Sequence, residues 1–260
     1  MRVKLIIEYE GTNYAGWQRQ KNAVAVQQVI EEAIHKSLGE ETAIVGAGRT
    51  DAGVHAFGQV AHFDTETNIP ADKLSYVLNM VLPPDIRIRE SAHVEDDFNA
   101  RRDATGKHYR YIIYNDAHAP AINRQTRAHV RYDLDDGLMK AAARYFVGTH
   151  DFESFHAANT DIVGTVRTLH AVEVTRIAQE IYIDVLGNGF LYNMVRIMVG
   201  TLIDVGKGKT APADIPAIIE GRRRDLAGAT APAKGLTLME VMYEGKKRRL
   251  FCLGCKKSCE

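Results

Sequence analysis

Four side chains that can do chemistry stand within seven positions near the start of the chain, namely Arg49, Thr50, Asp51 and His55. A carboxylate, an imidazole, a hydroxyl and a cation are the groups that proteins use for acid–base and nucleophilic chemistry and for charge stabilisation. Three glycines lie among them, at positions 46, 48 and 53. Because glycine accepts positive φ, it lets a backbone approach a ligand closely. Residues 46–56 are therefore the first candidate for a functional site.

The spacing in this stretch does not fit a nucleotide-binding loop. Gly46-x-Gly48-x-x-Asp51 begins like the dinucleotide-binding pattern, but Asp51 stands where the third glycine belongs. No amphipathic helix follows, so a phosphate would lack a helix N-terminus. A short apolar run at 43–45 and an alternating run at 57–63 predict a loop between two strands. Taken alone, the loop is equally compatible with a structural turn whose Asp51 faces solvent.

Residues 98–114 form a second informative stretch. Lys107, Tyr109 and Tyr111 alternate, so in a strand they share one face. From Arg101 to Arg131 the chain has seven Lys or Arg residues against two acidic residues. An aromatic face beside a basic edge suits an RNA base and its phosphates. A half-buried strand with a solvated basic edge has the same pattern, and that alternative stays open.

Residues 190–204 predict a helix that is apolar nearly all round and therefore buried, with Arg196 in its middle. A buried guanidinium needs an acidic partner, because an unpaired buried charge is strongly destabilising. The nearest acid on the helix, Asp204, lies two turns away. Asp51 is the best candidate, since a carboxylate in a pocket needs a cation to stay ionised. The alternative is that Arg196 extends its head group to the surface.

Hydrophobic patterns predict the elements that must position these residues. In the first half of the chain they predict strands at 2–9, 57–64 and 86–94, a helix at 25–38 and a second helix opened by Pro70. In the second half they predict a strand around 107–111, a hairpin at 166–177 and 180–186, helices at 190–204 and 215–220, and a strand at 236–243. This order is typical of split β-α-β units, with mostly antiparallel sheets and helices on one face. Trp17, the single tryptophan, is predicted to anchor the core.

Composition limits the class of protein without selecting a function. The chain has 260 residues, of which 45% are hydrophobic and 25% charged, as in soluble globular proteins. No apolar run is long enough to cross a membrane, and the first residues lead into a strand and not into a signal peptide. Three cysteines within the last nine residues argue against a disulfide framework. Cys252, Cys255 and Cys259 could bind zinc with a fourth ligand, but a mobile basic tail with free thiols is the favoured interpretation.

The run from Gly48 to Ala56, GRTDAGVHA, resembles the catalytic motif of the TruA-type tRNA pseudouridine synthase family. Further stretches resemble other motifs of that family, namely residues 9–20, the Lys-x-Tyr-x-Tyr pattern at 107–111, the loop 148–155, the helix 190–202 and the strand 234–238. The resemblance covers about residues 3–243. Two positions depart from the pattern: Glu10 stands where the family more often has Asp, and Ala25 stands where a Ser or Thr usually caps the helix.

This resemblance implies isomerisation of uridine to pseudouridine in the anticodon stem-loop of tRNA, at tRNA positions 38, 39 and 40. It implies that Asp51 is the catalytic carboxylate, Arg196 its ion-pair partner and Tyr109 the tyrosine at the target uridine. The residues expected to bind the substrate are Tyr109, Arg49, His55, Lys107, Arg101, Leu236 and Leu238. Among them, Arg49 is expected to fill the space that a flipped base leaves.

The expected fold is α+β. Two similar α/β-sandwich halves would join their mostly antiparallel sheets into one central sheet, with helices on one side and the RNA-binding cleft on the other. The predicted boundaries are 1–104 for the half with the Asp51 loop, 105–244 for the half with Tyr109 and Arg196, and 245–260 for the tail. The resemblance also implies a cytoplasmic homodimer, with one tRNA spanning both subunits and no contact with a membrane.

No cofactor or metal is expected, because the reaction neither oxidises nor hydrolyses its substrate. The residues leave open whether the carboxylate attacks C6, attacks C1′ or supports a glycal route. Two rival functions use the same residues. One is a catalytically silent RNA-binding module. The other is a glycosidase-like hydrolase, which would want a second carboxylate near Asp51 that the loop does not supply.

Overall fold

The computed structural model describes residues 1–157 and 164–244. The strands of this part of the chain are β1 Arg2–Tyr9, β2 Val45–Gly46, β3 His55–Asp64, β4 Ile86–Val94, β5 Ala104–Asn115, β6 Ala128–Val130, β7 Gly148–Asp151, β8 Val166–Ile177, β9 Glu180–Gly187 and β10 Leu236–Tyr243. The α-helices are α1 Val26–Leu38, α2 Leu74–Asn79, α3 Asp136–Ala143, α4 Met194–Gly206 and α5 Ile215–Glu220.

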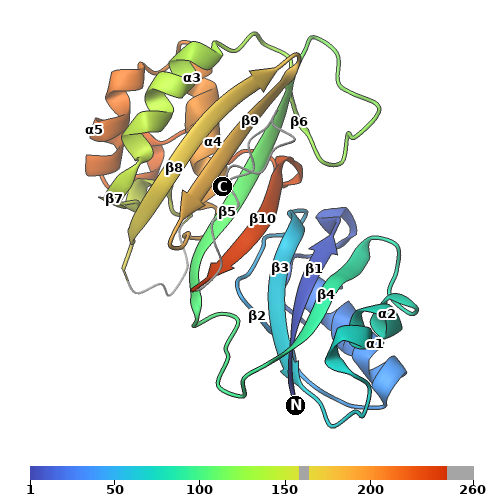
Figure 1. The fold of residues 1–260 in the computed structure, drawn as a ribbon. Helices are drawn as coiled ribbons and strands as arrows, with labels where there is room; N and C mark the ends of the chain where they lie inside the picture. The colour runs from blue at the N-terminus through green and yellow to red at the C-terminus, as the bar shows by residue number, and fades with distance from the viewer. Residues whose placement is uncertain (158–163, 245–260) are drawn as a thin grey trace, which may run out of the picture.

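The strands form one sheet across the molecule (Figure 1), in the order β4-β1-β3-β10-β5-β9-β8-β7, with β2 beside β3 and β6 beside β5. All pairings are antiparallel except β3 with β10 and β5 with β6. The sheet confirms the predicted α+β class and its mostly antiparallel pairing. The predicted tail with Cys252, Cys255 and Cys259 lies outside the described residues.

The last strand of the chain joins the two halves of the sheet. On one side β10 runs parallel to β3, with Leu238 beside Ala56, and on the other side it runs antiparallel to β5, with Leu238 beside Tyr109. Because the loop that contains Asp51 leads directly into β3, this arrangement brings that loop beside β5. Residues about 60 positions apart in the chain thereby meet at the middle of the sheet.

The helices cover one face of the sheet, as predicted, and gather toward its two ends (Figure 1). On β5, Tyr109, Tyr111 and Ile113 are buried on this face, whereas His108 and Arg110 point to the opposite face and are only partly buried. The expected position of the cleft was wrong in one respect. The cleft opens on the helix-bearing face, because Tyr109 and Leu236 project there, at the point where β3, β10 and β5 meet between the two groups of helices.

Two predicted helices differ in their bounds from the observed ones. The helix expected from residue 190 begins at Met194, because Asn193 adopts a left-handed backbone conformation with φ of 60°. The helix opened by Pro70 divides into a 3₁₀ turn, Ala71–Lys73, and the short α2. Trp17 is only 2% exposed, which confirms its place in the core. In the described part of the chain, no helix is long and apolar enough to cross a membrane.

Candidate active site

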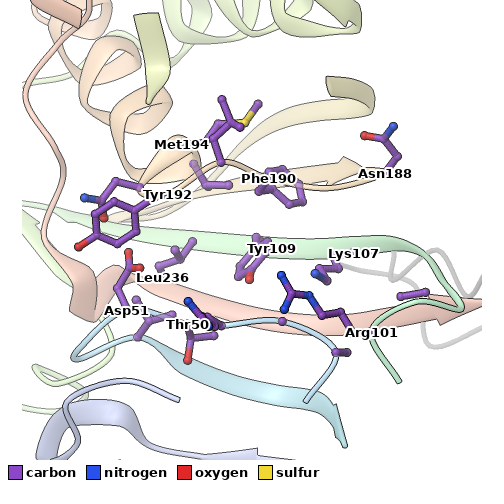
Figure 2. Close-up of a pocket in the computed structure, with 18 residues that line it drawn as sticks. Thr50, Asp51, Arg101, Lys107, Tyr109, Asn188, Phe190, Tyr192, Met194 and Leu236 are labelled. Atoms are coloured by element: carbon purple, nitrogen blue, oxygen red, sulfur yellow. The ribbon is translucent and has the colours of Figure 1, made fainter. Parts of the chain in front are cut away.

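A pocket of about 690 Å³ opens at the middle of the helix-bearing face, a size typical of small-molecule sites. Its walls come from four segments: the loop 47–54, the start of β5, the start of β10 and the segment 188–195 that leads into α4. Figure 2 shows the arrangement of its side chains. Asp51 lies toward one end, Arg101 and Lys107 lie toward the other, and Tyr109 lies between them. The pocket therefore has an anionic end and a cationic end.

Asp51 forms an ion pair with Arg196, as the sequence predicted. Nη1 of Arg196 donates to Oδ2 of Asp51 at 3.1 Å, and the two side chains are only 17% and 20% exposed. No residue of the described chain donates a hydrogen bond to Oδ1 of Asp51. One carboxylate oxygen is therefore oriented by the guanidinium, and the other is left available in a pocket-lining residue.

Arg196 is itself held by two further acceptors. Its Nε donates to the backbone oxygen of Ala231 at 2.8 Å, and its Nη1 also donates to Oδ1 of Asn193 at 2.8 Å. The segment with Ala231 can lie this close to α4 because Gly200 has no side chain: a Cβ there would stand 1.7 Å from the backbone oxygen of Ala229. Packing of backbone against helix thus fixes the direction of the guanidinium toward Asp51.

The loop that carries Asp51 is anchored on both sides of that residue. The backbone oxygen of Thr50 accepts from the N–H of Trp17 at 3.1 Å, and its hydroxyl is hydrogen-bonded to the hydroxyl of Tyr9 at 2.8 Å. On the other side, the N–H of Val54 donates to the backbone oxygen of Asp51 at 3.1 Å. Gly16, with φ of +89°, permits the close approach of the Trp17 segment to Thr50, since a Cβ on Gly16 would stand 2.5 Å from the backbone oxygen of Thr50. The carboxylate is therefore presented from a braced backbone.

Burial raises the pKa of Asp51 above its ordinary range, and the hydrogen bond and charge of Arg196 offset only part of that increase. The sequence predicted that a cation would lower the pKa of Asp51. The larger effect of burial on this pKa could not be predicted, because burial depends on elements far apart in the chain. The carboxylate is thus easier to protonate than an exposed aspartate.

Tyr109 lies in the floor of the pocket and is 7% exposed. Its ring meets that of Phe190 edge to face, with centroids 5.1 Å apart. Burial raises the pKa of its phenol, and the negative charge of Asp51 adds to the effect, so the hydroxyl stays protonated at neutral pH. In the described part of the chain this hydroxyl has no hydrogen-bond partner. Tyr109 therefore offers both an aromatic surface and a proton donor inside the pocket.

Three cations border the pocket without a carboxylate partner among residues 1–157 and 164–244: Arg49, Arg101 and Lys107. Burial lowers the pKa of Lys107, and nearby Arg101 lowers it further. Lys107 also lies against the backbone of the Asp51 loop, since a Cβ on Gly48 would stand 2.7 Å from its Nζ. Cations kept unpaired beside a pocket are suited to an anionic ligand such as a phosphate.

His55 and Leu238 were expected at the substrate, but neither lines the pocket. His55 is 3% exposed, its Nδ1 accepts from the N–H of Gly11, and its Nε2 faces the backbone oxygens of Gln125 and Lys234. Its ring thus fastens three backbone segments together. Leu238 is fully buried under the pocket, between β3 and β5. The sequence pattern could not separate these supporting positions from those that reach the cavity.

Several pocket residues were not singled out from the sequence, namely Asn188, Phe190, Tyr192 and Asn193. Phe190, Tyr192 and Asn193 were assigned to the apolar helix, and Asn188 lay between that helix and the predicted hairpin. The one available signal was polar: Asn193 interrupts an apolar run at the point where the helix begins. In residues 1–157 and 164–244, no three His, Cys, Asp or Glu side chains lie close enough together to hold a metal ion.

The chain is similar to known proteins over most of its length. The family model described as "tRNA pseudouridine synthase" matches residues 5–103 and 142–244. The first range contains the loop with Asp51, and the second contains the helix with Arg196. The chain belongs to the tRNA pseudouridine synthase family. Membership makes it an isomerase that converts uridine to pseudouridine in tRNA, as the resemblance predicted.

Several curated relatives share one name with each other, and each matches this chain over nearly its whole length. Two proteins called "tRNA pseudouridine synthase A", from Ruminiclostridium cellulolyticum and Acetivibrio thermocellus, are each 53% identical to this chain over 93% of it and 99% of their own length. A third, from Geotalea daltonii, is 48% identical with the same coverage. The similarity therefore extends over almost the whole chain and is not limited to one motif.

Proposed function

We propose that this enzyme isomerises uridine in the anticodon stem-loop of tRNA, at positions 38, 39 and 40, with Asp51 as its catalytic carboxylate. The reaction breaks the bond between N1 and C1′, turns the uracil, joins C5 to C1′, removes the proton from C5 and adds a proton to N1. It needs no electron transfer and no water. A carboxylate performs it either by attacking the uridine or by stabilising positive charge at C1′.

The observation that carries this proposal is the single ion pair of Asp51. Arg196 occupies one carboxylate oxygen and leaves the other without a partner, in a residue that lines the pocket. A carboxylate with a structural role is expected to have both oxygens engaged. We infer that the unengaged oxygen of Asp51 faces the ribose or the uracil of the bound nucleotide.

Other pocket residues take supporting roles in this proposal. A target base that is stacked in RNA must leave the stack to reach a buried carboxylate, at a cost of a few kcal/mol. Tyr109 would stack on the flipped base, and its hydroxyl would assist removal of the C5 proton. Leu236 supplies an apolar wall. Arg101 and Lys107 would neutralise phosphates at the other end of the pocket.

One experiment tests the proposal directly. The purified protein is incubated with an unmodified tRNA transcript, and pseudouridine is mapped along the RNA. We expect pseudouridine at positions 38 to 40 wherever uridine occurs there. Pseudouridine only at other positions would contradict the proposed target. Binding without any pseudouridine would favour the silent RNA-binding module, and free uracil would favour the hydrolase.

We further propose a cytoplasmic homodimer in which one tRNA contacts both subunits, with the halves 1–104 and 105–244 as the two units of each chain. A stem-loop must reach a pocket deep in the sheet, and a second subunit would hold the rest of the tRNA. Light scattering on the purified protein, alone and with tRNA, gives the number of chains per complex. A monomer that binds one tRNA with full activity would contradict the dimer.

A further inference from the structure

A second, smaller pocket adjoins the proposed active site. It has a volume of about 190 Å³, just over a quarter of the main pocket, and lies against the start of α1. The two pockets share three lining residues: Gly48, Arg49 and Arg101. The wall between them is therefore one glycine and two arginines.

A hydrogen-bond donor without a protein acceptor borders this second pocket. Trp17 lines the pocket, and its indole N–H has no acceptor among the described residues. The nitrogen lies close to the backbone of the Asp51 loop, since a Cβ on Gly46 would stand 2.4 Å from it. An indole N–H that has no protein acceptor and belongs to a pocket-lining residue is available to donate to an acceptor on a ligand.

Two amide side chains that line the pocket are held in fixed positions from below. Buried Glu31 accepts from the amide nitrogen of Gln27 at 2.9 Å, and the amide oxygen of Gln27 accepts from the amide nitrogen of Gln18 at 2.8 Å. The amide oxygen of Gln18 in turn accepts from Nε of Arg49 at 3.1 Å. A chain of hydrogen bonds thus runs from α1 to the wall of the active site and orients both amides.

The same chain leaves the arginines of the wall free for an anion. Arg49 uses Nε on Gln18, so its two terminal nitrogens have no partner among the described residues. The guanidinium of Arg101 likewise has no carboxylate partner in that part of the chain. Consecutive nucleotides of RNA are joined by one phosphate, and arginine is well suited to bind it through two parallel hydrogen bonds.

We infer that the second pocket holds the base of the nucleotide next to the target uridine, and that Arg49 and Arg101 bind the phosphate between the two. This inference rests on the proposed function, because it takes the main pocket as the site of the target. The indole N–H of Trp17 and the amide of Gln18 would form hydrogen bonds to the edge of that base. Gln27 would only position Gln18, because its amide is already fully hydrogen-bonded to Glu31, Ile44, Gln18 and Arg19. Recognition of splayed RNA bases commonly uses such edge contacts.

The first test removes a neighbouring base from the RNA. Two stem-loops are made that carry an abasic residue on either the 5′ or the 3′ side of the target uridine, and kcat/KM is compared with that of the intact RNA. We expect about a tenfold loss for one of the two, the size typical of one base contact, and less than about a twofold loss for the other. The melting temperature of each RNA controls for changes in the stem. Equal losses, or none, would overturn the inference.

The second test fills the pocket from the protein side. Val45 lines it and is 39% exposed, so Val45→Trp places a bulky ring in the cavity. We expect this variant to lose about tenfold on intact RNA and to become insensitive to the abasic change, because the two changes remove one shared contact. Val166→Trp, at an exposed valine at the start of β8, is the matched control and should retain both activity and sensitivity. A Val45→Trp enzyme that keeps its sensitivity would contradict the inference.

Two further measurements keep the outcome clear. If Val45→Trp does not fold, Gln18→Leu gives the same test at an exposed position by breaking the link to Arg49. Formation of pseudouridine in intact RNA by the unaltered enzyme tests the proposed function alone. If no pseudouridine forms in intact RNA, the proposed function fails. If pseudouridine forms but the abasic RNAs show equal losses or none, only the neighbour-base inference fails.

Discussion

Two aspartates near the middle of the sheet, Asp51 and Asp184, are buried to a similar extent, but their pKa values shift in opposite directions. Asp51 is 20% exposed and has one partner, Arg196, whereas Asp184 on β9 is 19% exposed and has two, His108 and Arg110. Burial raises the pKa of both carboxyls. At Asp184 the hydrogen bonds and charges of its partners reverse the effect and the net pKa is lowered, while at Asp51 the net pKa stays raised.

The difference lies in how fully each carboxylate is engaged. At Asp184, Arg110 donates to both oxygens, at 2.9 and 3.2 Å, and Nε2 of His108 lies 2.7 Å from one of them. These groups lie on the sheet face opposite the pocket, in neighbouring strands, where Arg110 and Asp184 are directly paired. A saturated carboxylate stabilises the sheet, whereas an unsaturated one in a pocket retains an oxygen for chemistry.

The sharpest way to break this comparison is to neutralise Asp51. We expect Asp51→Asn to reduce pseudouridine formation by about 10³-fold or more, the scale seen when an essential catalytic group is removed. Affinity for tRNA should persist, since phosphate contacts supply most of it. Single-turnover assays and filter binding measure the two quantities. Retained turnover in the purified variant would sink the assignment of Asp51.

The next largest effect is expected at Arg196. Arg196→Met keeps much of the stem but removes the cation that orients Oδ2 of Asp51, so we expect kcat to fall by about 10²-fold, as when one preorganised donor is lost. Arg196→Lys should recover only part, because lysine lacks the planar fork that reaches Asp51, Asn193 and Ala231 together. Comparing kcat with tRNA affinity checks the prediction. An equal loss in both would point to a structural role.

A smaller effect concerns the pH profile. Because the folded pKa of Asp51 is raised, the acid limb of kcat/KM should lie above pH ~3.9, the ordinary value for aspartate. Arg196 lowers that pKa, so its removal in Arg196→Met should move the limb to still higher pH. The residual activity of the variant is followed across the acidic range. A limb that stays in place or moves downward would show that the titrating group is not Asp51.

Asp184→Asn should affect stability more than catalysis. The lowered folded pKa means that the ionised carboxylate stabilises the fold above the unfolded pKa of about 3.9, and that this contribution is lost as the pH falls through the folded value. We expect a loss of roughly 1–3 kcal/mol at pH 7, reduced from the values for fully buried pairs by partial exposure. Urea unfolding at pH 7 and below pH 4 tests it, and the difference from the unaltered enzyme should shrink in acid.

Asp51→Asn is the matched control for that measurement. Because the folded pKa of Asp51 is raised, its ionised form opposes folding at neutral pH, and neutralising it should leave the free energy of unfolding unchanged or increased. A large loss of stability in Asp51→Asn would remove the contrast between the two aspartates.

The smallest expected effect is that of chelation. Neither aspartate belongs to a metal-binding cluster among the described residues, and the isomerisation needs no Lewis acid. Activity should therefore be unchanged after treatment with EDTA and gel filtration. Loss of activity that zinc restores would assign a required metal to Cys252, Cys255 and Cys259, which lie outside the described residues.

Much of the fold could be predicted because its signals are local. Alternation in β1 and in β5, helical spacing in α1, and the glycine-rich loop between two strands each depend on neighbours within a few positions. The helix was predicted to begin at residue 190, four residues before its observed start at Met194, because Phe190 and Leu191 are as apolar as the helix itself. Only the left-handed backbone of Asn193 marks the boundary.

The sequence by itself determined the chemistry of the loop at Asp51 and the requirement that Arg196 find an acid. No acidic residue lies within reach of Arg196 along its mostly apolar helix, so the need for a distant carboxylate follows from the sequence alone. The tertiary structure decided the features that depend on burial and on contacts between distant parts of the chain. It selected Asp51 from 145 positions away, let burial outweigh the cation in the pKa of Asp51, put the cleft on the helix-bearing face, and buried His55 and Leu238 outside the pocket lining. These outcomes depend on how β10 joins the two halves of the sheet, and no pattern of nearby residues encodes that junction.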